Sequence, residues 1–419
     1  MNGAESIRSP SASQRALVVF ACFVCQLGLG YTYLFSAVLP EATAELGWTR
    51  AQFSSGRWPY FAMTALGGLA AGQWTVRFGA RPVLVTGALC LAAGLALLSR
   101  MQDLAMFWIA QIFYGLFMAG LGDVAIAGVL TSWVRGARGA AMGFVYAASN
   151  IAGFFVPQVF AAGVSARGWR ATLLWMGLAG AAVILPFAWI AGRSAPGGAA
   201  AASGPASASA LSLGEALRTR TFWLLAFTIF GFFFFFLGMN DAFVSFLNDL
   251  GMSREEAARH YGIATGAGGV SKLVAGWFGD RLPAKTALVL DHALLALAAL
   301  LVFALPVTPA LFFPFLAAYG FAIAARDVVY PLALAHCFGE RTMPAIYGAV
   351  MMSLFVAAPL GSMVTSRVRD VTGSYEPAFA GFAVLNVAML AALWFVRREV
   401  SDYASGENLR PAKGATTGA

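Results

Sequence analysis

Charged residues, histidines and cysteines are scarce in this sequence. Only 11% of its 419 residues are charged, whereas 60% are hydrophobic. A water-soluble protein of this length cannot bury so much apolar surface in its own core, so the composition excludes a soluble globular protein. The three histidines lie far apart without metal-ligand spacing, and the four cysteines lie in or beside apolar segments. We therefore expect no metal, no cofactor and no disulfide.

Long apolar segments dominate the sequence instead. Twelve of them are about 20 residues or more in length, which an α-helix needs to cross a bilayer. They lie near residues 16–39, 52–76, 82–99, 104–133, 139–164, 171–192, 221–247, 257–279, 284–305, 309–337, 345–366 and 377–396. The sequence therefore predicts an all-α membrane protein with twelve transmembrane helices.

The net charge of +8 is unevenly distributed along the chain. If the N-terminus lies inside, the predicted inner segments carry about twice as many Lys and Arg residues as the outer ones. This bias is the positive-inside rule, and it predicts that both termini are cytoplasmic. The excess of positive charge therefore reflects topology, and we expect the lipid bilayer as a partner and no nucleic acid.

The two halves of the chain repeat one another. The string ELGWTR (45–50) precedes one apolar segment, and DLGMSR (249–254) precedes another, 204 residues later. GQWTVRFGAR (72–81) and GWFGDRLPAK (276–285) follow the same two segments at the same offset. Between the halves, residues 193–213 are rich in Ala, Ser, Gly and Pro, which is typical of a flexible tether. We expect an N-terminal six-helix bundle over 1–192, a cytoplasmic linker over 193–220, a C-terminal six-helix bundle over 221–398 and a cytoplasmic tail over 399–419.

The repeated loops carry a family motif. Together with twelve helices and a central linker, the pattern G-x-x-x-D-R-x-x-x-R/K in GWFGDRLPAK resembles the major facilitator superfamily. The first copy departs from it, because Val76 stands where the family has an acid. The resemblance implies two bundles that alternate between inward-open and outward-open states around a site near the bilayer midplane. It also implies a cytoplasmic gate that contains Arg77, Arg81, Asp280, Arg281 and Lys285.

Three shorter motifs resemble one branch of that superfamily, the monocarboxylate porters and oxalate/formate antiporters. WVRGARGAAMG (133–143) is similar to W-F-x-x-x-R-G-x-A-x-G, and DVTGSYEPAF (370–379) is similar to D-x-T-G-S-Y-x-x-A-F. Lys272 and the following glycine and aspartate match R-x-x-x-G-x-x-x-D, with lysine in place of arginine. The resemblance implies that Lys272 contacts the carboxylate of the substrate. Porters of this branch carry a proton-accepting acid one turn earlier, where this sequence has Gly268.

Several charged residues lie deep inside apolar segments. At about 1.5 Å per residue, Lys272 lies about 12 Å, Asp123 about 15 Å and Arg326 about 18 Å from the cytoplasmic helix ends. In a hydrocarbon layer about 30 Å thick these positions are near the midplane, where an unpaired charge costs a few kcal/mol. We expect Lys272 to be a buried, unpaired cation that the arriving anion neutralises, with Arg326 as a second substrate contact.

Each of these charges also has a structural interpretation. The Lys272 side chain can extend toward the cytoplasmic interface, although about 12 Å is too far for full escape. Asp123 can neutralise a cation on another helix. Arg326 and Asp327 are adjacent, so we expect their side chains to diverge by about 100° and only one of them to face the cavity. Asp123 and Asp327 are also the candidates for carrying a proton.

Other residues are weaker candidates. The tyrosines that offer hydroxyl donors to a carboxylate are Tyr31, Tyr33 and Tyr114, although most buried tyrosines bond to backbone. The aromatic run GFFFFFLGMND (231–241) offers cavity walls. We expect Arg57 and Asp241 near the outer interface as gate or headgroup contacts, and Asp291 with His292 as a satisfied helix-packing pair.

Together these features predict a secondary transporter of a small organic anion, a monocarboxylate by resemblance, and not an enzyme. The sequence has no Walker-type phosphate loop, so we expect alternating access without ATP. Coupling to a proton and exchange for a counter-anion both stay open. The alternatives are a drug/proton antiporter, whose G-P-x-x-G-G element is missing from GFFVPQVFAAG (153–163), and a transporter-like membrane sensor. By compactness and resemblance alone, we expect a functional monomer in a bacterial inner membrane.

Overall fold

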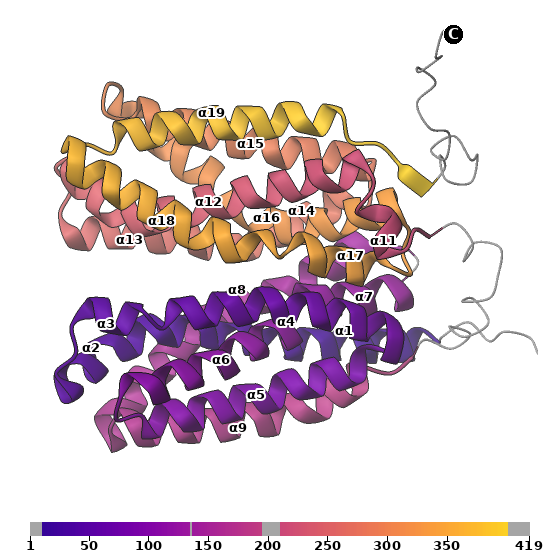
Figure 1. Cartoon of the computed structure of the whole chain (residues 1–419), viewed down its shortest axis with the longest axis horizontal. Coiled ribbons are helices and arrows are strands. Elements are labelled where there is room, and N and C mark those ends of the chain that lie inside the picture. The colour runs from indigo at the N-terminus through magenta and orange to yellow at the C-terminus, as the bar shows by residue number, and fades with distance from the viewer. Residues whose placement is uncertain (1–10, 135, 195–209, 401–419) are drawn as a thin grey trace, which may run out of the picture.

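The fold is helical throughout the described chain, which covers residues 11–134, 136–194 and 210–400 of a computed structural model. Figure 1 shows the helices of the first half, in indigo to magenta, along one long side of the molecule and those of the second half, in orange to yellow, along the other. The first half contains α1 (Ala12–Leu27), η1 (Gly28–Tyr33), α2 (Leu34–Leu46), α3 (Arg50–Ser54), α4 (Arg57–Phe78), α5 (Ala80–Arg100), α6 (Leu104–Leu121), α7 (Asp123–Trp133), α8 (Arg138–Arg167) and α9 (Trp169–Ala191). The second half contains α11 (Leu213–Ala216), α12 (Arg220–Asp249), α13 (Arg254–Gly266), α14 (Gly268–Gly279), α15 (Ala284–Ala304), η3 (Pro309–Leu311), α16 (Phe312–Phe338), α17 (Met343–Val350), α18 (Ser353–Thr372) and α19 (Glu376–Trp394).

Ten helical stretches of the described chain are long and apolar enough to cross a membrane. The protein is therefore an integral membrane protein with multiple spans, as its composition predicts. The ten stretches coincide with ten of the twelve predicted segments. The other two segments correspond to α4 and to α13 with α14, which are not among the ten, so the count of twelve stays a prediction.

Most of the predicted linker and tail lies outside the described residues. At the described end of the linker, a capping box between Ser212 and Glu215 starts the short helix α11. The N–H of Leu211 also donates to the Phe338 carbonyl at 3.0 Å. Figure 1 shows α11 at the same end of the molecule as the start of α1, α7 and α17, and we call this the linker end.

Four of the predicted apolar segments are interrupted inside the bilayer-spanning length. The interruptions are η1, the step from α6 to α7, the step from α13 to α14 and the step from α17 to α18. Carbonyls at these interruptions have side-chain partners: for example, Gln26 donates to the Leu121 carbonyl at 3.2 Å, and Asn150 donates to the Thr265 carbonyl at 3.3 Å. Discontinuous helices of this kind surround binding sites in transporters.

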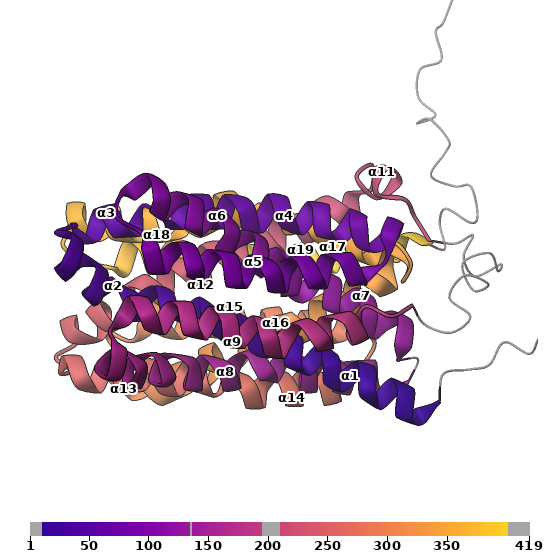
Figure 2. The ribbon, with the colours of Figure 1, turned by 90° about the horizontal axis from the view of Figure 1, so that it is seen from below.

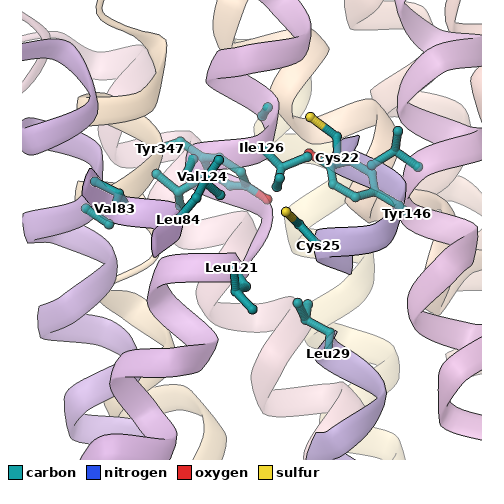
Figure 3. Packing of buried hydrophobic residues seen from close by; sticks show 14 of the residues in the cluster. Cys22, Cys25, Leu29, Val83, Leu84, Leu121, Val124, Ile126, Tyr146 and Tyr347 are labelled. Carbon is teal, nitrogen blue, oxygen red and sulfur yellow. The ribbon is translucent and has the colours of Figure 1, made fainter. Parts of the chain in front are cut away.

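An apolar core joins the two halves. Figure 3 shows Tyr347 of α17, from the second half, among Val83, Leu84 and Val124 of the first half, all in one buried cluster. A second cluster, which includes Phe235 and other aromatic residues, lies wholly in the second half. The interface between the halves is therefore part of the main core.

Small residues let the halves approach at the linker end. Figure 2 shows α8 running beside α14, and α4 beside α17. A Cβ atom on Gly143 would lie 2.3 Å from the Lys272 carbonyl oxygen, and one on Gly72 would lie 2.2 Å from the Pro344 carbonyl oxygen. Backbones this close leave no room for a side chain, so the linker end is closed.

The opposite end of the interface is open. A cavity of about 530 Å³ lies between α4, α12 and α18, with Trp58, Phe61 and Pro359 among its walls. Arg57 of the first half and Asp241 of the second half face each other across it, 3.6 Å apart. The protein is thus closed at the linker end and hollowed at the other.

Substitution of Gly143 by valine is expected to open the linker end. Overpacking costs about 1–3 kcal/mol, which shifts the ratio of closed to open protein about 5- to 150-fold. Spin labels on cysteines introduced at Ser194 and Thr286, exposed residues of the two halves at this end, should report longer distances in Gly143→Val. Gly262→Val on α13 is the control, because its Cβ would meet no atom within 4 Å. Identical distance distributions in the two variants would contradict the closure by glycine packing.

Candidate functional site

Four charged side chains meet where the halves face each other. Lys272 of α14 and Asp327 of α16 form an ion pair with 2.9 Å between Nζ and Oδ2. Asp327 also contacts the guanidinium of Arg326, which lies 3.8 Å from Asp123 of α7 in the other half. The chain Lys272–Asp327–Arg326–Asp123 carries no net formal charge. We call it the central ion-pair array.

Three hydrogen-bond acceptors surround the ammonium of Lys272. Besides Asp327, it donates to the Ser149 hydroxyl at 2.9 Å and to the Tyr146 carbonyl at 3.2 Å, both on α8 of the other half. An ammonium has three donors, so all of them are used. Lys272 is only 5% exposed and does not extend to the interface. The expectation of an unpaired cation is therefore wrong.

Arg326 and Asp327 face the same array, so the expected divergence of their side chains is also wrong. The long Arg326 side chain folds back onto the carboxylate of its neighbour, which cancels the separation at the backbone. Arg326 also donates to the Tyr347 hydroxyl at 3.4 Å. Its guanidinium lies over the rings of Phe232 and Phe233, at 4.9 and 5.2 Å, so two members of the aromatic run on α12 form a wall here.

Asp123 reaches the array at the start of an interrupted helix. Gly122 leaves the helical conformation, with φ −73° and ψ −173°, and α7 begins at Asp123. The positive end of the helix dipole favours a carboxylate there. Asp327 follows Asp123 by 204 residues, the offset of the repeated loops, so the two acids are equivalent positions of the duplicated halves. That shared offset is a signal in the sequence that inspection of each charge alone misses.

The acids of the array are more accessible than the cations. The side chains of Asp123 and Asp327 are 18% and 16% exposed, against 8% for Arg326 and 6% for Lys272. Neutralising one acid leaves a cation without its partner, which costs several kcal/mol in a low-dielectric interior. Protonation of an acid therefore favours the binding of another anion at the freed cation.

Of the three candidate tyrosines, only Tyr33 interacts electrostatically with members of the array, Lys272 and Asp327. It is half-exposed. Tyr31 donates to the Met176 carbonyl at 3.2 Å, and Tyr114 donates to the Tyr31 carbonyl. Both of these hydroxyls therefore bond to backbone carbonyls inside the first half.

The contribution of α8 is missing from the sequence-based site. Tyr146, Ser149 and Asn150 occur together in FVYAASN (144–150), where polar residues interrupt an apolar segment. That interruption is the signal that would have identified them. Tyr347 carries no such signal, because a single tyrosine in an apolar segment is unremarkable.

Asp280 joins the halves at the linker end. Its carboxylate accepts from the N–H groups of Gly139 at 2.6 Å and Ala140 at 2.8 Å, so it caps α8 of the other half. In the first copy of the motif Val76 replaces this acid. Pro344, which takes the place of Gly139 at the start of α17, has no N–H to donate. Ala345, which takes the place of Ala140, donates its N–H to the Thr342 carbonyl at 3.0 Å. Of the two donors that Asp280 uses, one is thus missing in the first copy and the other has another partner.

The other four predicted gate residues do not bridge the halves through the contacts seen in the described chain. Arg77 lies over the Phe78 ring, Arg81 over Trp189 and Arg281 over Trp277, while Lys285 donates to the carbonyls of Trp394 and Val396. Arg138 of α8 and Glu340, just after α16, form a two-pronged ion pair across the interface instead, with 2.8 Å between Nη2 and Oε2. Neither residue of this pair is among the gate residues predicted from the sequence.

No group of three His, Cys, Asp or Glu residues in the described ranges is placed to hold a metal ion. The four cysteines are free and buried. Figure 3 shows Cys22 and Cys25 within the apolar cluster, where they contribute to packing.

Comparison with protein families and curated sequences gives consistent matches. A family model described as Major Facilitator Superfamily matches residues 18–362. Monocarboxylate transporter 13 of Bos taurus is 25% identical over 367 residues, which cover 85% of this chain and 80% of that protein. Monocarboxylate transporter 13 of Rattus norvegicus is 26% identical over the same shares.

Solved structures share the fold at low sequence identity. The proton:xylose symporter XylE bound to 6-bromo-6-deoxy-D-glucose has a TM-score of 0.72 and 14% identity, over 94% of this chain and 100% of its own. The E. coli fucose:proton symporter FucP has a TM-score of 0.69 and 14% identity, over 92% and 99%. The human organic anion transporter MFSD10 has a TM-score of 0.67 and 17% identity, over 90% and 99%.

Removal of the Asp280 cap is expected to weaken closure. Asp280→Ala loses two hydrogen bonds to helix N–H groups, about 1–2 kcal/mol, which shifts the closed-to-open ratio about 5- to 30-fold toward the open form. Val76→Asp should not strengthen closure, because Pro344 offers no N–H and the N–H of Ala345 is bonded to the Thr342 carbonyl. Spin-label distances between Ser194→Cys and Thr286→Cys measure both effects. A Val76→Asp protein that closes more firmly would contradict this account of the two donors.

Proposed function

The chain belongs to the Major Facilitator Superfamily, and from that membership we propose that it carries a small monocarboxylate across the membrane together with a proton. The observation that carries the proposal is the buried Lys272–Asp327 ion pair at the interface between the halves. The relatives named monocarboxylate transporter 13 support the substrate class.

Substrate and Asp327 compete for Lys272. A substrate carboxylate presents the same pair of oxygens to the ammonium as Asp327 does from 2.9 Å away. While Asp327 is ionised, the array is neutral and an additional anion is unfavourable. A proton on Asp327 removes its charge, and the substrate carboxylate then restores neutrality at Lys272. Proton and anion therefore favour each other's binding.

The rest of the substrate lies among uncharged groups. The half-exposed Tyr33 interacts electrostatically with Lys272 and offers a hydroxyl group. The Phe232 and Phe233 rings beside Arg326 provide an apolar wall. One carboxylate and a short carbon skeleton match this combination of a single cationic anchor and aromatic surface.

Transport follows from the position of the array between the halves. Lys272 holds α8 of the first half through Ser149 and Tyr146, so an exchange of its partners changes the contact between the halves. With both termini cytoplasmic, the closed linker end is the inner end and the present state faces outward. Reorientation then opens the linker end and closes the cavity that contains Arg57 and Asp241.

The proposed unit is a monomer, since both sides of the array come from one chain. Its membrane orientation, with cytoplasmic termini, rests on the distribution of Lys and Arg. The relatives are bovine and rat proteins and give the predicted bacterial inner membrane no support.

Uptake into proteoliposomes tests the function. Radiolabelled lactate, pyruvate, formate and oxalate are supplied with and without an inward proton gradient. One-to-one symport of a proton and a monocarboxylate should allow up to about tenfold accumulation per pH unit, and a proton ionophore should abolish it. Transport that requires an internal anion and ignores the gradient would indicate exchange. No transport of any of the four would overturn the substrate class.

Loss of the cationic anchor is expected to abolish most transport. Lys272→Ala removes a charge-assisted hydrogen bond worth about 1.5–3 kcal/mol, so kcat/KM for the transported monocarboxylate should fall about 10- to 150-fold. Lys272→Arg keeps the charge and should retain part of the activity. Arg15→Ala removes an exposed cation of α1 and serves as the control. A Lys272→Ala protein with wild-type kcat/KM and normal thermal stability would remove Lys272 from the site.

Neutralising Asp327 is expected to uncouple substrate binding from pH. In the wild type, rising pH ionises Asp327, which recaptures Lys272, so binding and counterflow exchange should weaken toward alkaline pH. Asp327→Asn leaves Lys272 without this competitor at every pH, so its exchange should stay flat across the range while proton-driven accumulation is lost. Asp370→Asn, which removes an exposed acid of α18, should keep the wild-type profile. A wild-type pH profile in Asp327→Asn would contradict the competition.

A further inference from the structure

A third acid near the array, Asp291 of α15, has no role in the mechanism above. It is 5% exposed, and neither carboxyl oxygen has a hydrogen-bond partner among the described residues. The expectation of a satisfied pair with His292 is wrong. Nδ1 of His292 lies 3.7 Å from Asp291 but bonds to the Leu288 carbonyl at 3.0 Å. A carbonyl only accepts, so Nδ1 carries the hydrogen, and Nε2, which also lacks a partner, is a free acceptor.

Asp291 lies between the array and the linker end. By helical rise it is about 10 Å from the start of α15, whereas Asp327 is about 16 Å from the end of α16 on the same side. The charged and titratable groups that interact with it come from two elements: His292 from α15, and Arg326, Asp327 and Tyr330 from α16. Three other elements pack against α15: α19 carries the buried but neutral Asn386, α14 carries Lys272, which is paired with Asp327, and η3 carries no charged residue.

The surroundings of Asp291 require it to be neutral in this conformation. An ionised carboxylate without a partner in a buried, low-dielectric position costs several kcal/mol. The cation that interacts with it, Arg326, is already held by Asp327 and by Asp123. Asp291 therefore holds a proton while the linker end is closed.

Opening of the linker end changes this balance. Asp123 belongs to the opposite half, so separation of the halves withdraws it from Arg326. We propose that Asp291 then releases its proton toward the linker side and pairs with Arg326 in place of Asp123, which makes Asp291 the proton-release group of the transport cycle. This inference rests on the proton-linked function proposed above.

The proton balance closes at one proton per cycle. Asp327 takes a proton from the cavity side together with the substrate. After the halves part, the O–H bond of Asp291 breaks and its proton goes to water on the linker side, with Nε2 of His292 as the neighbouring acceptor. Once the substrate has left, the Asp327 proton passes to the Asp291 carboxylate. Asp327 then recovers Lys272, and Arg326 returns to Asp123 as the linker end closes.

Asp291→Asn separates proton release from substrate binding. The carboxamide cannot ionise, so proton-driven accumulation in proteoliposomes should fall from up to about tenfold per pH unit to nearly onefold. Counterflow exchange, and its weakening toward alkaline pH through Asp327, should persist. Asp291→Glu should restore accumulation, and Asp370→Asn is the control for loss of an acid. Unchanged accumulation in Asp291→Asn would overturn the inference, whereas no proton-driven accumulation in the wild type would overturn the proposed function itself.

An infrared measurement tests the proton on Asp291 even if transport by the variant is lost altogether. A protonated carboxyl group has a C=O stretching band distinct from that of a carboxylate. The wild type, purified without substrate, should show such a band that is absent from Asp291→Asn and persists in Asp327→Asn. A wild-type spectrum identical to that of Asp291→Asn in this region would also overturn the inference.

Discussion

Charge neutrality of the central ion-pair array is the constraint on which the rest of the site depends. Two cations and two acids lie together where a membrane protein excludes most water, and an unpaired member would cost several kcal/mol. A change of charge at one member therefore favours a compensating change at another. In the proposed cycle, binding of an anion, uptake of a proton and movement of one half away from the other are consequently linked by electrostatics, without a separate signalling element.

The duplicated halves have equivalent backbone contacts but different charged residues at the array. Gly68 stands 204 residues before Lys272, and its carbonyl faces Gly348 just as the Lys272 carbonyl faces Gly143. Close packing is therefore symmetric, while both cations of the array come from the second half. The first half contributes one acid, Asp123, and the acceptors on α8. Under the proposed function, this division places the substrate-binding cations in one half and makes the other half the partner that can be released.

The sequence predicts the architecture better than the site. Apolar length, the distribution of Lys and Arg and the 204-residue offset depend on local composition, so they are visible without a structure. The depth of Lys272, Asp123 and Arg326 also follows from counting along a helix. The partners in the ion pairs do not follow from such counting, because they depend on how each helix is rotated about its axis and where it is interrupted. The long side chain of Arg326 folds back onto Asp327. The interruption at Gly122 falls within a segment that the apolar pattern predicts as one continuous helix.

The close backbone contact between the halves and the hydrogen bonds of the Lys272 ammonium both lie between α14 and α8. Lys272 places its carbonyl against Gly143 of α8, and its ammonium on Ser149 of the same helix. The ion pairs at the two ends are weaker by comparison: the Arg138–Glu340 and Arg57–Asp241 pairs are partly exposed, and such pairs contribute about 0–1 kcal/mol. The equilibrium between states therefore depends mainly on the Asp280 cap and on the contacts at the centre. A ligand that changes the partners of Lys272 therefore acts directly on the contact that must break, and only such a differential contact can shift the population.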